Sequence, residues 1–177
     1  YPLLPHLLDV AAVGARLQHL IPCPVEAPCS SEWITFLVGA HDLGKATPGF
    51  QFIVRSPSGI DGAPKRHDAS TVPILIPALT SLGVPQDVAH QLSMAIAAHH
   101  GEPIPANEIE DSRWSYTPVW TEAHSIVVSG LLAGSGANEL PSLPSDATDR
   151  SVFLQWLMGL TTVSDWIGSS EALCEWS

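Results

Sequence analysis

The feature that most constrains this chain is an apolar segment that ends in charged side chains. The segment "WITFLVGA" covers residues 33–40, and it runs directly into His41 and Asp42, with Lys45 three residues further on. Such a segment belongs inside a protein, and a carboxylate carried in with it is costly unless it is paired or bound to a metal. The chain must therefore fold so that other residues reach Asp42.

Length and composition are those of one folded domain. The chain has 177 residues, of which 45% are hydrophobic and 14% charged. This is enough to build a sizeable core, and it excludes an intrinsically disordered chain. We therefore expect a single domain over residues 1–177. No apolar run approaches the roughly 18 residues of a membrane span, so we expect no membrane partner.

The first residue and the cysteines bear on the cellular location of the protein. The chain begins with Tyr rather than Met, which indicates a trimmed start or a longer parent chain, and no secretory signal pattern is present. Its three cysteines, Cys23, Cys29 and Cys174, form no disulfide framework, which favours reduced thiols and a cytoplasmic protein. A zinc site at Cys23 and Cys29 is disfavoured, because no second Cys/His pair completes it at the usual spacing.

Hydrophobic periodicity predicts helices nearly throughout, and strand signals are scarce. We therefore predict an all-α fold. The turn signals add a break or kink at Pro73 and Pro77, and an irregular segment over residues 101–117. The predicted helices cover residues 5–21, 32–45, 67–82, 85–100, 118–134 and 150–168.

Net charge argues against a stand-alone nucleic-acid-binding protein. The formal charge is −11, and neutralising phosphates requires Lys and Arg. The few cations are nevertheless concentrated in one stretch. Four of the seven basic residues fall between positions 45 and 66: Lys45, Arg55, Lys65 and Arg66.

Histidines at helix ends and loop edges, together with two aspartates in apolar helical sequence, form a candidate ligand set. Imidazole nitrogen and carboxylate oxygen are common ligands of first-row metals. Neighbouring side chains on a helix point about 100° apart, so a His-Asp or His-His pair can face two ions. The set is His6, His41, Asp42, His67, His99, His100 and Asp165.

Each of these residues also has an ordinary interpretation. A histidine at a helix end usually interacts with the C-terminal carbonyls, and a buried Asp165 could bond a nearby hydroxyl. For His19, His90 and His124 we keep that ordinary structural role. We also expect Trp166 to lie in the core rather than to stack on a base.

The order of the candidate residues along the chain resembles the HD superfamily of metal-dependent phosphohydrolases. More narrowly, the chain resembles the HD nuclease domain of the type I CRISPR-associated helicase-nuclease. The matching segments span residues 6 to 170: "HLLDVAAV", "GAHDLGKATPGFQ", "RHDAS", "AAHHG" and "SDWIGSS". The related cyclic dinucleotide phosphodiesterases carry a Gly-Tyr-Pro element where this chain has "GEPIPANE", which counts against that branch.

The resemblance implies a single globular HD-domain helical fold with a two-metal centre at the helix ends. It also implies cleavage of single-stranded DNA displaced by a guide-RNA surveillance complex. Helicase domains are expected downstream in the native protein and are absent from this chain, so the partners would be those domains, or a separate helicase, and the surveillance complex. The cofactors would be two divalent transition-metal ions: iron, nickel, cobalt, manganese or zinc.

Roles for individual residues follow from the same resemblance. Asp42 would bridge the two ions. Lys45, one helical turn away, would steady a phosphate oxygen. Lys65 and Arg66, just before His67, are candidate contacts to the DNA strand, with the charges of a solvated loop as an equally favoured alternative. Gly44 and Gly101 would allow a close backbone approach. His6, His41 and Asp165 would complete one metal site, and His67, His99 and His100 the other.

Two other functions stay open at this point. The chain could be an HD phosphohydrolase that acts on a nucleotide or cyclic dinucleotide, which substrate preference would distinguish. It could also be a non-catalytic domain that docks to the surveillance complex, although the complete ligand set argues against this.

Overall fold

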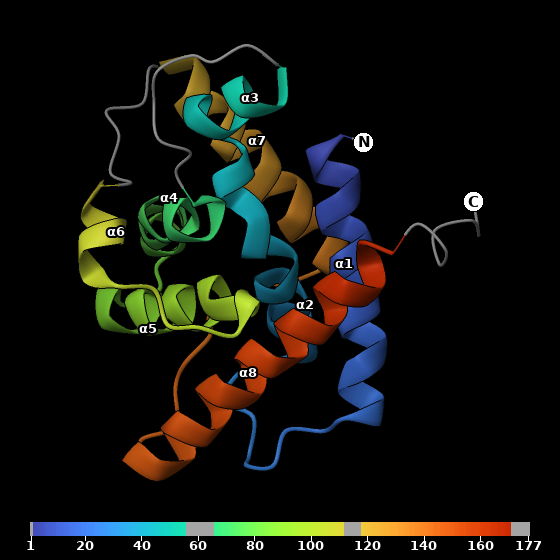
Figure 1. Cartoon of the computed structure of the whole chain (residues 1–177). Helices are drawn as coiled ribbons and strands as arrows, with labels where there is room; N and C mark the ends of the chain where they lie inside the picture. The colour runs from blue at the N-terminus through green and yellow to red at the C-terminus, as the bar shows by residue number, and fades with distance from the viewer. Residues whose placement is uncertain (1, 56–65, 112–117, 171–177) are drawn as a thin grey trace.

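Every regular element that the structure describes is helical (Figure 1). The structure is a computed structural model, and it describes residues 2–55, 66–111 and 118–170, without the side chains of residues 52–55, 110 and 111. Two of the elements, η1 and η2, are short 3-10 helices. In chain order the elements are α1 (Leu3–Leu20), α2 (Ser31–Gly39), η1 (Ala40–Lys45), α3 (Pro48–Arg55), α4 (His67–Ser81), α5 (Gln86–Ala97), η2 (Ala98–His100), α6 (Ala106–Asp111), α7 (Pro118–Ser135) and α8 (Ala147–Gly168).

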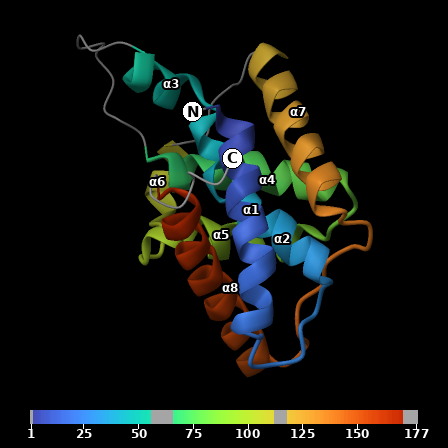
Figure 2. The ribbon, with the colours of Figure 1, turned by 90° about the vertical axis from the view of Figure 1, so that its right-hand side faces the viewer.

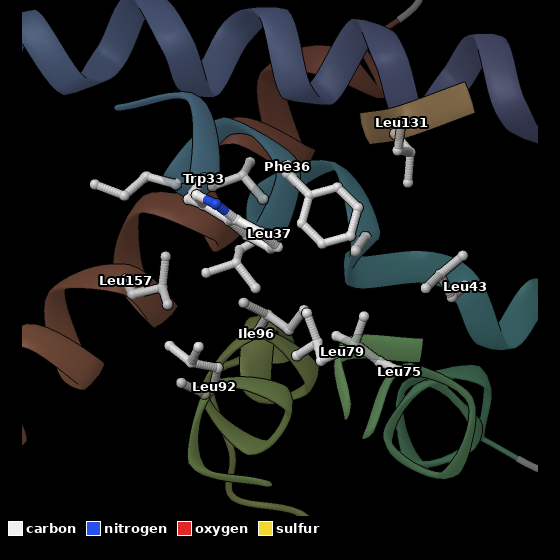
Figure 3. Packing of buried hydrophobic residues seen from close by; sticks show 14 of the residues in the cluster. Trp33, Phe36, Leu37, Leu43, Leu75, Leu79, Leu92, Ile96, Leu131 and Leu157 are labelled. Atoms are coloured by element: carbon white, nitrogen blue, oxygen red, sulfur yellow. The ribbon is translucent and has the colours of Figure 1, made fainter. Parts of the chain in front are cut away.

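Helix α2 is the centre of the fold. It begins at a cap in which Ser30 accepts a hydrogen bond from the Trp33 N–H, and every residue from Trp33 to Gly39 is buried. A helix that is apolar on all sides must be covered by other helices. Figure 3 shows these helices supplying the surrounding side chains: Leu75 and Leu79 from α4, Leu92 and Ile96 from α5, Leu131 from α7 and Leu157 from α8.

The long helices pack so that distant parts of the sequence become neighbours. Helices α1 and α8, the first and the last, lie side by side (Figure 2). Helix α4 packs against η1 and α5. As a result, α1, η1, α4, η2 and α8 all reach one region of the molecule. None of the described helices is long and apolar enough to cross a membrane.

The all-α prediction is confirmed, with three local corrections. The helix predicted over residues 32–45 ends at Gly39 and tightens into η1. Of the break or kink predicted at Pro73 and Pro77, the break is wrong, because α4 continues through both prolines; the kink stays a prediction. The segment predicted as irregular contains the short helix α6.

Candidate metal centre

The seven predicted ligands converge on one site from five different elements. They form two groups, and within each group the candidate ligand atoms all lie within 4.8 Å of one another. The first group has two acids and two imidazoles, whereas the second has imidazoles alone. The first is His6, His41, Asp42 and Asp165, and the second is His67, His99 and His100.

His41 and His99 occupy equivalent local positions. Each follows the buried last turn of a helix and lies in a 3-10 turn. Each places its ring Nδ1 3.0 Å from the carbonyl oxygen three residues earlier, that of Val38 and of Ile96 respectively. A carbonyl can only accept, so Nδ1 donates. In a neutral ring the lone pair is then on Nε2, which faces the site. This is the tautomer and orientation that a metal ligand requires.

Asp42 lies between the two groups and is 1% exposed. Its Oδ2 is 3.4 Å from His6 Nε2 and 3.2 Å from His41 Nε2. Its Oδ1 is 3.1 Å from His67 Nε2 and 3.7 Å from His99 Nε2. One carboxylate oxygen therefore faces each group. The backbone of Asp42 leaves helical geometry, at φ −106° and ψ 20°, and this kink places the side chain between the groups.

Asp165 completes the first group from α8. Its Oδ1 lies 3.4 Å from His41 Nε2, and the Ser169 hydroxyl donates to the same oxygen over 2.6 Å. The carboxylate is therefore oriented from two sides before any ligand is added. Our alternative interpretation, a buried acid bonded to a hydroxyl, describes part of this arrangement, but it leaves the close approach to His41 unexplained.

The two buried imidazoles have pKa values shifted in opposite directions. Burial alone would lower the pKa of His41, but Asp165 and Asp42 outweigh it and raise that pKa to about 9. Burial and the neighbouring charge of His41 lower the pKa of His99 to about 4. Burial would raise the pKa of Asp42 and of Asp165, yet their contacts with His41 hold both below the usual carboxyl range.

The residues fit a pair of transition-metal ions. Within the described part of the chain, three buried polar atoms of the site lack a hydrogen-bond partner: His41 Nε2, His99 Nε2 and Asp42 Oδ1. A buried polar atom left unpaired costs about 1–3 kcal/mol, and a bound cation would remove that cost. In addition, the Nε2 atoms of His67 and His100 face each other at 3.1 Å. Mixed imidazole and carboxylate donors suit iron, cobalt, nickel, manganese or zinc.

Lys45 lies beside the centre and forms an ion pair with Asp42. The Gln51 side-chain amide donates to the Lys45 carbonyl over 2.9 Å, which ties the end of η1 to α3. The Phe50 ring makes an edge contact with His67 at 5.5 Å between centroids. Helix α3 thus supports both Lys45 and His67.

A threonine that sequence reasoning missed holds the His41 turn in place. Thr71 of α4 is fully buried, and its hydroxyl accepts from the Gly44 N–H at 2.9 Å and lies 2.9 Å from the His41 carbonyl, to which it donates. Gly44 makes this approach possible, because a Cβ there would lie 1.7 Å from the His67 carbonyl oxygen. The predicted close approach at Gly44 is therefore made to α4.

The His99 turn has a comparable support from α8. The Thr162 hydroxyl lies 2.7 Å from the His99 carbonyl and donates to it. Gly101 ends η2 in the left-handed conformation, at φ 89°, and a Cβ there would meet nothing within 4 Å. Gly101 is thus required by its backbone conformation. Neither threonine stands out in the sequence, because a hydroxyl within an apolar helix carries no periodic signal.

Arg66, a predicted DNA contact, is already engaged. It donates to the buried Asp68 carboxylate from Nε and Nη2, and its Nη1 lies 3.4 Å from Glu108. Burial would raise the pKa of Asp68, but Arg66 outweighs it and lowers that pKa. These ion pairs position the start of α4, next to His67. The other predicted contact, Lys65, lies outside the described residues.

The remaining histidines and Trp166 also have clear positions. His19 and His90 are exposed, whereas His124 is buried and its Nε2 lies 2.6 Å from the Ala46 carbonyl, at the end of η1. The prediction that Trp166 lies in the core is wrong, because it is 68% exposed. It follows Asp165 on α8, where the last turn of the helix faces solvent on one side.

Comparison with known proteins agrees with this geometry. The family model "Cas3, HD domain" matches residues 1–174. The chain is 29% identical to the CRISPR-associated endonuclease/helicase Cas3 of Thermus thermophilus, over 98% of this chain and 21% of that protein. It thus spans about a fifth of the length of this curated relative.

Solved structures resemble the chain over almost its whole length. The Thermus thermophilus Cas3 HD domain, crystallised in the presence of Ni²⁺, matches with a TM-score of 0.78 and 30% identity, over 99% of this chain and 74% of that chain. A chain of a CRISPR RNA-guided surveillance complex in a pre-nicking state matches with a TM-score of 0.74 and 25% identity, over 98% of this chain and 23% of that chain. With its family model, its fold and its ligand set in agreement, this chain belongs to the Cas3 HD domain family.

Proposed function

We propose that the chain is a metal-dependent nuclease domain that cleaves single-stranded DNA in type I CRISPR interference. The observation that carries the proposal is Asp42, which directs one carboxylate oxygen to each of two ligand groups. Two divalent ions held there would polarise a phosphodiester and lower the pKa of a bound water. The ligands of one ion would be His6, His41, Asp42 and Asp165, and those of the other His67, His99, His100 and Asp42.

The chain's own residues prepare this chemistry. The Val38 and Ile96 carbonyls orient the rings of His41 and His99 so that each Nε2 faces the site. His99 is neutral and ready to bind, whereas His41 must first release a proton. The Lys45 ammonium lies against Asp42, where it can offset negative charge that develops on a phosphate oxygen. His100 is exposed, so the second group is open to solvent and to a polymeric substrate.

Substrate and partners form part of the same proposal. Its support comes from the relatives: the curated one is named an endonuclease/helicase, and a matched chain belongs to an RNA-guided surveillance complex. Helicase domains, in the same protein or a separate one, would deliver the strand, which agrees with the net charge of −11. Arg66 could reach the strand only by leaving Asp68. The cytoplasmic location stays a prediction from the cysteines.

The test is cleavage of a labelled circular single-stranded DNA at low salt. The parent chain is assayed with Ni²⁺, Mn²⁺, Fe²⁺, Co²⁺ or Zn²⁺, with and without EDTA. We expect circles to be linearised only with metal, and Asp42→Ala to slow cleavage by at least about 100-fold, since the residue shared by both groups is lost. Asp87→Ala, which removes an exposed acid on α5, is the matched control.

Two results would contradict the proposal. If Asp42→Ala cuts circles as fast as the parent, the shared-ligand assignment fails. If the parent binds two ions and leaves circles intact with every metal, the polymeric substrate is wrong, and small phosphoesters such as cyclic dinucleotides become the substrates to assay. A folded parent chain that binds no metal at all would favour the docking function.

A further inference from the structure

Trp166 has an exposure that is unusual for tryptophan. Its side chain is 68% exposed, whereas Trp33 is 3% exposed and Trp156 is half-buried, with its indole N–H bonded to the Ile21 carbonyl. Tryptophan is on average among the most buried residues, because its large apolar surface is costly to leave in water. An exposed indole therefore calls for an explanation in terms of what it contacts during function.

The position of Trp166 relates it directly to the metal centre. The preceding residue, Asp165, turns its carboxylate toward His41 at 3.4 Å. Four residues before Trp166, Thr162 donates to the His99 carbonyl. Residues four apart share one face of a helix, so the Trp166 side chain lies one turn beyond the contact with the His99 turn. It therefore lies next to Asp165 on α8, one helical turn from the residue that contacts the His99 turn.

Apart from the ions proposed for the centre, the charges of the chain leave little attraction for the phosphates of the neighbouring nucleotides. The chain has 18 acidic and 7 basic residues. The two described cations closest in sequence to the ligands, Lys45 and Arg66, are paired with Asp42 and Asp68. Beyond the scissile phosphate, a strand held here needs a contact that does not depend on charge. Stacking of a base on an aromatic ring meets that need and accepts every base.

We propose that the Trp166 indole is the stacking platform for a nucleobase next to the scissile phosphate. This inference rests on the proposed function and deepens it. A base can lie flat on the indole only when it is unpaired and turned out of a duplex, so Trp166 gives the site its preference for single strands. The metal centre acts on the phosphate, and Trp166 binds an unpaired base beside it.

The test compares two substrates that share a backbone. One is a single-stranded oligonucleotide, and the other has the same length with tetrahydrofuran units in place of its nucleosides. For the Ni²⁺-loaded parent we expect a KM about tenfold lower on the base-bearing strand, the size of one stacked base. In Trp166→Ala we expect the ratio of the two KM values, base-free strand over base-bearing strand, to fall to about one while kcat stays unchanged. Trp166→Phe should restore most of this ratio.

Ile126→Ala is the control, because Ile126 is 60% exposed on α7 and is not part of the site. It keeps the parent's ratio. The stacking proposal is overturned if Trp166→Ala keeps the parent's ratio, as expected when a protein surface covers the indole. It is also overturned if that variant slows both substrates equally, as expected of a structural residue. Thermal melting and metal content verify that the variants are folded and loaded.

Binding of the same two strands, measured by fluorescence anisotropy, separates this inference from the nuclease proposal. If the parent cuts neither strand but binds the base-bearing one more tightly in a Trp166-dependent way, stacking holds and cleavage fails. If the parent cuts both strands with no dependence on Trp166, cleavage holds and stacking fails.

Discussion

His41 and His99 have the same local setting and opposite charge states. Both follow the buried last turn of a helix, both are at most 1% exposed, and both donate from Nδ1 to a carbonyl three residues earlier. The pKa of His41 is nevertheless raised to about 9, and that of His99 is lowered to about 4. The difference lies in the neighbouring charges: two carboxylates lie near His41, whereas His99 has one carboxylate at 3.7 Å and the charged His41 ring beside it.

The comparison separates what the local sequence determines from what the fold determines. An apolar helix that ends in a 3-10 turn is enough to bury a histidine and direct its Nε2 into the site. The charge that the ring carries depends on Asp165, which arrives from the far end of the chain on α8. Local sequence thus builds two equivalent ligands, and tertiary structure makes them different.

The largest expected effect comes from displacing the His41 turn while leaving the His99 turn untouched. In Gly44→Ala the new Cβ would meet the His67 carbonyl oxygen at 1.7 Å, so η1 and α4 must separate. We expect a loss of about 4 kcal/mol or more in the free energy of unfolding, measured by urea denaturation. Gly159→Ala is the control, because a Cβ there meets nothing within 4 Å, and it should be neutral or slightly stabilising. Equal stabilities of the two variants would disprove the close contact.

The second expected effect is a pH dependence of metal affinity that is confined to the first ligand group, which contains both acids and is called the acidic group below. Below about pH 9 the His41 ring carries a proton that a metal ion must displace, whereas His99 is neutral above about pH 4. Affinity for the ion at the acidic group should therefore rise with pH, by up to about tenfold per unit, and level off near pH 9. Isothermal titration with Ni²⁺ between pH 6 and 9 measures it.

Asp165→Asn tests whether His41 causes this pH dependence of Ni²⁺ affinity. It removes one of the two carboxylates that keep the proton on His41, so the rise in affinity should move to lower pH as the affinity itself falls. The same carboxylates imply that the metal-free chain loses stability as pH rises through about 9, because the protonated form of His41 is the favoured one. A pH-independent first binding step in the parent chain would contradict the assignment.

The smallest expected effect comes from the support of the His99 turn. Thr162→Val removes the hydroxyl that donates to the His99 carbonyl and keeps the volume of the side chain. The Ni²⁺ affinity of the second ligand group, which consists of imidazoles alone, should fall about tenfold with little change in Tm. Thr162→Ser should restore it. Thr80→Val makes the same change on α4 at a hydroxyl bonded within its own helix, so it should leave affinity unchanged. If both valine variants lower affinity alike, the effect is not specific to the His99 turn.

Periodicity was enough to predict the long helices, but it could not resolve their ends. The tight turn at Asp42 looks like continued helix in sequence, because only the tertiary contacts at Thr71 and Gly44 bend it. The prolines of α4 imply a break, yet buried neighbours such as Leu75 and Leu79 hold the helix together. Helix α6 is too short and too polar to give a periodic signal.

The candidate ligands could be predicted from the sequence, whereas the exposure and the contacts of the residues around them could not. The order of His, His-Asp, His, His-His and Asp indicated the seven ligands, and the fold brings all seven together; that they bind metal stays a prediction. The exposure of Trp166 and the ion pair between Arg66 and Glu108 were not predictable, because both depend on which helix lies opposite. The contributions of Thr71 and Thr162 were missed for the same reason.

The adjacency of α1 and α8 has a consequence for how the chain stays folded. His6 and Asp165 belong to one ligand group although they stand near opposite ends of the sequence. An ion bound by both closes a loop that contains nearly all of the chain, much as a crosslink does. Since the unfolded chain holds no such site, the ion's binding free energy adds to the stability of the whole fold. Chelation would therefore loosen the first and last helices together, and the chain would be most open to proteases in its metal-free form.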